Sequence, residues 1–106
     1  MDSSQTLVFD EIDSGMGGVT AYAVADKLEA ISESQQVICI THSAAIAARA
    51  KQHLYLEKQE EGGRTKTTVQ DLQRPERIAE LARMLGGSAG SEDLMRHAAR
   101  LLDRQN

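Results

Sequence analysis

Hydrophobic and polar positions fall into blocks along the chain, and each block predicts one element of secondary structure. A short apolar run at 6–9 leads into two acids, and a second at 37–40 leads into Thr41-His42. Runs this short are typical of strands buried on both faces, as in parallel sheets. Between them, apolar residues recur at steps of three and four, which predicts a helix over 19–32. Its apolar stripe consists of Ala21, Val24, Ala25, Leu28 and Ile31.

A strand, a helix and a second strand of these lengths form a crossover unit. Such units place their two strands parallel, with a right-handed connection. The carboxyl ends of parallel strands lie at the same edge of the sheet, where ligands of such sheets bind. The sequence therefore predicts that Asp10-Glu11 and Thr41-His42 converge on one edge.

The middle of the chain is expected to hold a short helix and a hairpin. Ser43 can cap a helix that runs to about residue 50. The segments 53–59 and 64–71 favour strands, because the first alternates apolar with polar residues and the second is rich in threonine and valine. The intervening Glu60-Glu61-Gly62-Gly63 predicts a hairpin turn.

Two helices are predicted toward the C-terminal end. The first begins near Pro75 and ends at Gly86-Gly87. Its apolar positions are Ile78, Leu81, Ala82 and Leu85. Ser91 can cap the second, whose apolar positions are Leu94, Met95, Ala98, Leu101 and Leu102. With 86–90 as a linker, we expect one unit over 1–87 and a C-terminal helix over 88–106.

Composition narrows the functional classes. With 106 residues, 41% apolar and 26% charged, the chain is at most one domain of ordinary soluble type. The formal charge of −4 argues against binding a nucleic-acid backbone by bulk electrostatics. Cys39 lies inside an apolar run, which predicts a small buried side chain in a reducing compartment. No membrane-length apolar run or signal-peptide pattern is found, so we expect a cytoplasmic protein and no membrane partner.

The predicted edge carries the candidate chemistry. Asp10 and Glu11 could serve as one metal-ligating carboxylate and one carboxylate that activates water. His42 at the same edge could donate a hydrogen bond to a phosphate. A polar strand end that only begins a loop is the plainer interpretation of the two acids. Asp13-Ser14-Gly15 is built from residues that turns prefer, and alone it predicts an ordinary turn.

Zinc is an alternative metal for this part of the chain. Asp10, Asp13 and His42 could form a zinc site, but no dense His/Cys spacing supports it.

Basic residues recur near the C-terminal end. Arg96, Arg100 and Arg104 stand four residues apart, and Arg74 and Arg77 precede them in sequence. This pattern could form an anion-binding or DNA-facing stripe. The acidic overall balance favours a solvated helix face instead.

The segments 6–18 and 37–43 together resemble the C-terminal half of an ABC-type ATPase head of the SMC-like group. Within that group, Arg77 to Gly87 (Arg-Ile-Ala-Glu-Leu-Ala-Arg-Met-Leu-Gly-Gly) and the hairpin strand from Gln52 through Lys58 are similar to the RecN family. The resemblance extends to about Gly87. It implies an α/β fold, part of a P-loop NTPase, with a mostly parallel sheet, flanking helices, a C-terminal hairpin and C-terminal helices.

The resemblance also assigns roles. Asp10 corresponds to the Walker B aspartate that holds Mg²⁺, and Glu11 to the catalytic glutamate. His42 corresponds to the switch histidine. Asp13, Ser14 and Gly15 match the D-loop, which meets a second head near the nucleotide. ATP and Mg²⁺ are the implied cofactors, in the complete head only.

The phosphate-binding loop G-x-x-x-x-G-K-[ST] does not occur in the sequence. We therefore expect a fragment that is inactive alone and needs an N-terminal head portion and a coiled coil of the same protein. The resemblance further implies a homodimer of heads, DNA contact through the full-length protein, and double-strand break repair and recombination at the bacterial nucleoid. The alternatives are a head fragment of another SMC-like or recombination-type ATPase, and a non-enzymatic docking module.

A partial sheet exposes an edge and an apolar face that would otherwise be covered. We therefore expect this chain to associate with itself, by strand pairing or by exchange of terminal helices.

Overall fold

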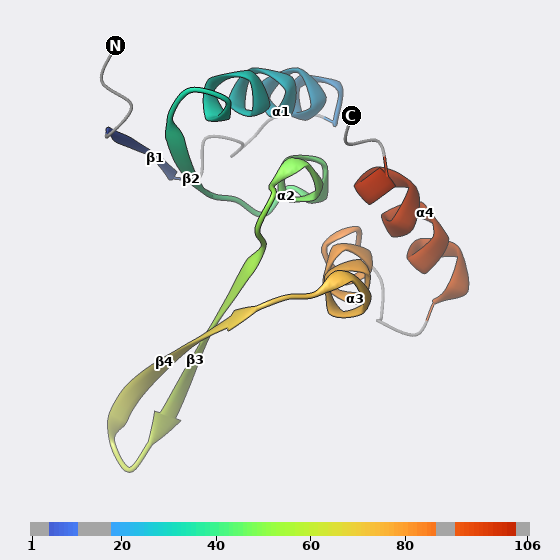
Figure 1. Ribbon diagram of the computed structural model, residues 1–106. Coiled ribbons are helices and arrows are strands. Elements are labelled where there is room, and N and C mark those ends of the chain that lie inside the picture. Colours follow the sequence, from blue (N-terminus) through green and yellow to red (C-terminus); the bar gives the residue numbers. More distant parts are fainter. Residues whose placement is uncertain (1–4, 11–17, 87–90, 104–106) are drawn as a thin grey trace.

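The computed structural model describes residues 5–10, 18–86 and 91–103 (Figure 1). In chain order they form β1 (Thr6–Asp10), α1 (Gly18–Ser32), β2 (Gln36–Ile40), α2 (Ala44–Arg49), β3 (Leu54–Glu61), β4 (Arg64–Asp71), α3 (Arg74–Met84) and α4 (Glu92–Asp103). The fold is thus α/β, with one parallel and one antiparallel pair of strands among the described residues. The predicted elements are confirmed, with ends that coincide or differ by at most three residues.

Strands β1 and β2 pair in parallel, with α1 between them in sequence. Leu7 lies opposite Val37 and Asp10 lies opposite Ile40, so the two strands end level with each other. Helix α1 also contacts β2 and α2. The crossover unit predicted from the apolar runs is therefore confirmed.

The prediction that these strands are buried on both faces is wrong. One face carries the apolar side chains of Val8, Ile38 and Ile40, which are 63%, 47% and 51% exposed. The opposite face, which includes Phe9 and Cys39, is half-buried, so the expectation of a fully buried Cys39 is also wrong. The reason is that a parallel sheet needs a layer on each face, whereas α1 is the only described helix in contact with this pair.

The hydrophobic core lies among α2, α3 and α4. Leu81 of α3 is fully buried at its centre. The other buried members are small or aliphatic side chains: Ala44, Ala47, Ala48, Ala82, Ala98, Leu101 and Leu102. Alanines on three facing helices allow their backbones to approach closely, which explains how a chain with few aromatic residues forms a core.

Local interactions fix the ends of the helices. The hydroxyl oxygen of Ser43 accepts a hydrogen bond from the Ile46 amide at 3.4 Å, as expected for the cap of α2. Pro75 lies in the first turn of α3. Gly86 follows α3 with a φ of +105°, a conformation that glycine adopts without steric cost.

The hairpin β3–β4 projects away from the helices (Figure 1). Its antiparallel ladder runs from the Leu54–Asp71 pair to the Glu61–Arg64 pair at the turn. Among the described elements, each of these two strands contacts only the other. Both Gly62 and Gly63 have positive φ values, +55° and +81°, which the two-residue turn requires. The hairpin is thus stabilised mainly by its own ladder.

Candidate functional site

The carboxyl-terminal edge of the β1–β2 pair is the site that the sequence predicts. Asp10 is the last residue of β1, exposed, and opposite Ile40. His42 follows Ile40 by two residues, is also exposed, and precedes the cap of α2. The parallel register therefore places Asp10 and His42 at the same edge of the sheet, as the crossover argument requires.

The remaining predicted site residues, Glu11, Asp13, Ser14 and Gly15, lie outside the described residues. Their roles as catalytic glutamate and D-loop stay predictions, as does the zinc alternative, which includes Asp13. No group of three or more possible metal ligands is found within 5–10, 18–86 and 91–103.

The donor types at the edge suit a magnesium–nucleotide ligand. The carboxylate of Asp10 is a hard oxygen donor of the kind that Mg²⁺ takes, together with phosphate oxygens. An imidazole such as that of His42 can donate a hydrogen bond to a phosphate oxygen. Both residues are exposed at a strand terminus and therefore accessible to a ligand. The edge thus fits part of such a site.

Arg77 has a role that the sequence reasoning did not predict. The sequence pattern predicts a solvated face for this arginine, but the residue is only 9% exposed. Its Nη2 donates hydrogen bonds to the carbonyl oxygens of Ala47 at 3.0 Å and Ala48 at 3.3 Å, and to that of Ala50. The carbonyls of Ala47 and Ala48 lie in the last turn of α2, and that of Ala50 belongs to its C-terminal cap. The solvated-face prediction is therefore wrong for Arg77.

The other arginines of that pattern lie on the surface. Arg96 and Arg100 of α4 are exposed. Arg74 makes an ion pair of 3.0 Å with Asp103, which joins the start of α3 to the end of α4. Arg104 lies outside the described residues. For the described members other than Arg77, the prediction of exposed side chains is confirmed.

His53 lies next to the Arg77 region and is half-buried. Burial lowers the pKa of His53, the charge of Arg77 lowers it further, and the carboxylate of Glu80 partly offsets this. Burial also lowers the pKa of Arg77. The Nδ1 atom of His53 is buried without a hydrogen-bond partner among the described residues. The neutral imidazole is thus the form that this position favours.

Comparison with solved structures assigns the fold. The chain is similar to a structure described as "Structural biochemistry of ATP-driven dimerization and DNA stimulated activation of SMC ATPases", with a TM-score of 0.53 and 26% identity. The match covers 74% of this chain and 47% of the other. The fold is therefore that of part of an SMC ATPase head. No family model matches the chain.

Curated relatives narrow this class. The chain is 47% identical over 102 residues to the DNA repair protein RecN of Treponema pallidum. It is 48% identical to RecN of Deinococcus radiodurans and 42% identical to RecN of Bacillus subtilis, each over 97 residues. The chain therefore corresponds to one segment of a RecN protein. These matches cover 92–96% of the chain but only 17–18% of each relative's length.

No described helix has both the length and the apolar character needed to cross a membrane.

Proposed function

We propose that this chain supplies the Walker B and switch-histidine edge of a RecN-type ATPase that acts in DNA repair. In this proposal Asp10 binds Mg²⁺, Glu11 activates the attacking water, and His42 donates a hydrogen bond to the terminal phosphate. Asp13, Ser14 and Gly15 form the loop that meets a second head. The bound Mg²⁺ supplies neutralisation of charge on the phosphate oxygens.

The observation that carries the proposal is that β1 and β2 end opposite each other in the parallel register. Asp10 pairs with Ile40 in the parallel register, and His42 follows two residues later. A carboxylate and an imidazole from segments about 30 residues apart in sequence thus belong to the same edge, where ligands of parallel sheets bind. A strand pairing in the opposite direction would have separated them.

The remainder of the site must come from residues that this sequence does not contain. A phosphate-binding loop has no counterpart here, so we propose that the chain alone turns over no ATP. The relatives are DNA repair proteins, and the similar structure is described in terms of ATP-driven dimerization and DNA stimulation. We extend both properties to this chain as part of a complete protein: a homodimer of heads that contacts DNA through other segments.

A chimera tests the proposal. This chain replaces the matched segment of Bacillus subtilis RecN, and ATP turnover is measured for the chimera and for its Glu11→Gln variant. We expect the chimera to hydrolyse ATP and Glu11→Gln to lower turnover by about 10²- to 10⁴-fold, the range for loss of a general base. Glu33→Gln is the matched control, because Glu33 is an exposed acid in the turn after α1.

Equal turnover in the chimera and its Glu11→Gln variant would refute the catalytic assignment and favour a docking module. A folded chimera without activity would refute the proposal that this chain supplies a functional edge.

A further inference from the structure

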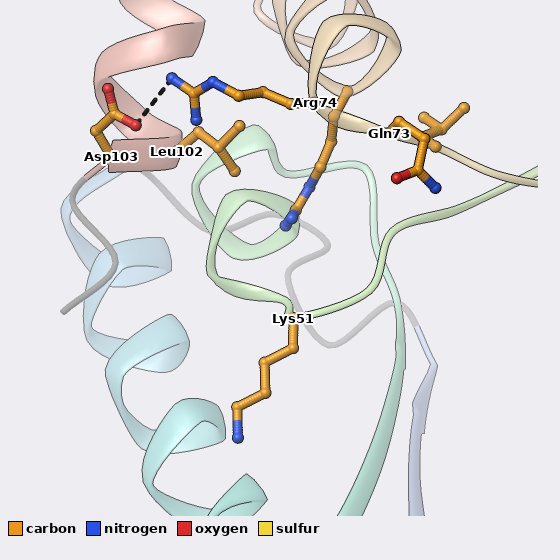
Figure 2. Close-up of a pocket in the computed structure, with 7 residues that line it drawn as sticks. Lys51, Gln73, Arg74, Leu102 and Asp103 are labelled. Carbon is orange, nitrogen blue, oxygen red and sulfur yellow. Dashed lines mark ion pairs between the residues drawn. The ribbon is translucent and has the colours of Figure 1, made fainter.

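A cavity of about 410 Å³ lies where the chain leaves α2, α3 begins and α4 ends (Figure 2). Three cationic side chains, Lys51, Arg74 and Arg77, line it, together with one acid, Asp103. The chain as a whole has a formal charge of −4. The lining of this cavity is therefore positive in a protein that is otherwise acidic.

Arg77 contributes a fixed positive charge to the cavity wall. Its side chain is nine-tenths buried, and its Nη2 is held by neutral main-chain carbonyls at the end of α2. No carboxylate among the described residues forms an ion pair with it, and its Nε is buried without a hydrogen-bond partner. No described carboxylate therefore neutralises the charge of Arg77, and this charge adds to the positive potential of the cavity.

The other two cations can adapt to a ligand. The side chain of Arg74 is 56% exposed and points to that of Asp103, which is 62% exposed (Figure 2). Lys51 is exposed, and its side chain extends away from Arg74 in this view. Ion pairs between exposed side chains contribute little to stability, so another anion can replace Asp103 as the partner of Arg74 at little cost.

Gln73 and Arg74, at the start of α3, line the cavity. The Gln73 main-chain amide already donates to the Glu76 carboxylate at 2.8 Å, so the side chains and not the helix end supply the positive charge. Arginine matches the oxygens of a phosphate with paired donors, and lysine adds a mobile point charge. Two exposed cations and one fixed cation around one cavity are suited to a phosphate group.

We propose that this cavity binds a phosphate group of a small molecule. Arg74 donates hydrogen bonds to its oxygens, Lys51 does so once its flexible side chain turns toward the cavity, and Arg77 supplies a constant positive charge at the wall. The volume exceeds that of a phosphate, which leaves room for an attached organic part. The site is independent of the proposed ATPase function, because none of its residues belongs to the edge at Asp10.

Binding is tested by titrating the whole chain with inorganic phosphate at neutral pH and constant ionic strength, followed by amide NMR shifts. We expect saturable shifts centred on Lys51 and Arg74. Lys51→Gln and Arg74→Gln should each raise the dissociation constant about ten-fold, as for loss of one charge-assisted hydrogen bond. Arg96→Gln is the matched control, because Arg96 is an exposed arginine of α4 that does not line the cavity.

Shifts that do not saturate, or equal weakening in Arg96→Gln, would mean diffuse attraction and would overturn the proposal. Acetate that saturates with the same dissociation constant as phosphate would also overturn it, since the cavity would then select no phosphate. A parallel titration with glycerol 3-phosphate distinguishes a phosphate ester from the free phosphate ion as the ligand. Tighter binding than inorganic phosphate identifies a phosphate ester as the ligand, and equal binding identifies the free ion.

Discussion

Arg77 donates a hydrogen bond of 3.0 Å from its Nη2 to the main-chain carbonyl oxygen of Ala47. The two residues are thirty positions apart in sequence, and the bond joins α3 to the last turn of α2. A guanidinium at this place adds a charged donor to carbonyls at the end of α2, and it meets the negative end of the helix dipole. The contact therefore connects two of the three helices that form the core.

Substitution of Arg77 by glutamine should lower the free energy of unfolding by about 2–4 kcal/mol, because several buried carbonyls lose a charged donor. Urea denaturation followed by circular dichroism measures this change. Arg83→Gln is the control, since Arg83 pairs with Glu80 of the same helix and is 58% exposed. A loss for Arg77→Gln no larger than that for Arg83→Gln would show that the link between α3 and α2 is not stabilising.

Truncation at the centre of the core should be more costly than truncation on the hairpin. Leu81 is fully buried, so Leu81→Ala should cost about 2–5 kcal/mol through lost burial and the cavity that remains. Leu56 is 61% exposed on β3, and Leu56→Ala should cost less than about 1 kcal/mol. Thermal unfolding of the two variants measures the difference. Similar losses would indicate that the hairpin surface is covered in solution.

Stability should depend on pH through His53. Since the pKa of His53 is lowered in the fold from 6.5, the unfolded chain binds the proton more readily. The stabilising contribution is therefore complete above about pH 6.5 and is lost as pH falls toward the folded-state pKa. The slope from this one group is at most about 1.4 kcal/mol per pH unit.

Urea denaturation at several pH values measures this dependence. The His53→Gln variant should show a smaller acid loss of stability than the original chain. His97→Gln is the control, because His97 is exposed on α4. Equal pH slopes for the His53→Gln and His97→Gln variants would contradict a stabilising neutral His53.

The exposed apolar face of the β1–β2 pair should mediate self-association. Replacing Val8 and Ile38 together by threonine keeps strand propensity but removes apolar area from this face. We expect the double variant to shift toward monomer in sedimentation velocity at high concentration. Leu56→Thr on the hairpin is the control and should leave the distribution unchanged. A monomeric original chain, or an equal shift with Leu56→Thr, would contradict this role of the face.

The sequence predicted the elements because their signals are local. The three- and four-residue spacing of Ala21, Val24, Ala25 and Leu28 defined α1, and Ser43 marked the start of α2. The direction of β1 against β2 followed from the length of the connection. Because the strands are parallel, Asp10 and His42 were expected at the same edge.

Burial could not be predicted in the same way, because it depends on contacts between distant segments. The apolar run at β2 indicated a covered strand, yet Ile38 and Ile40 are about half exposed where no described layer lies over them. Arg77 is the opposite case, because the sequence pattern predicts an exposed side chain and the structure buries it. Arg74 and Glu76, just before it in sequence, are charged and exposed, but the carbonyls that hold it belong to a helix about thirty residues earlier. Neither case has a local signal.

The tip of the β3–β4 hairpin offers a practical handle on this protein. A Cβ atom built at Gly62 or Gly63 would meet nothing within 4 Å, and each strand of the hairpin contacts only the other among the described elements. A fluorophore or affinity peptide inserted between these two glycines would extend into solvent, far from the helical core (Figure 1). A label on the hairpin can thus report on self-association through the β1–β2 face without altering that face.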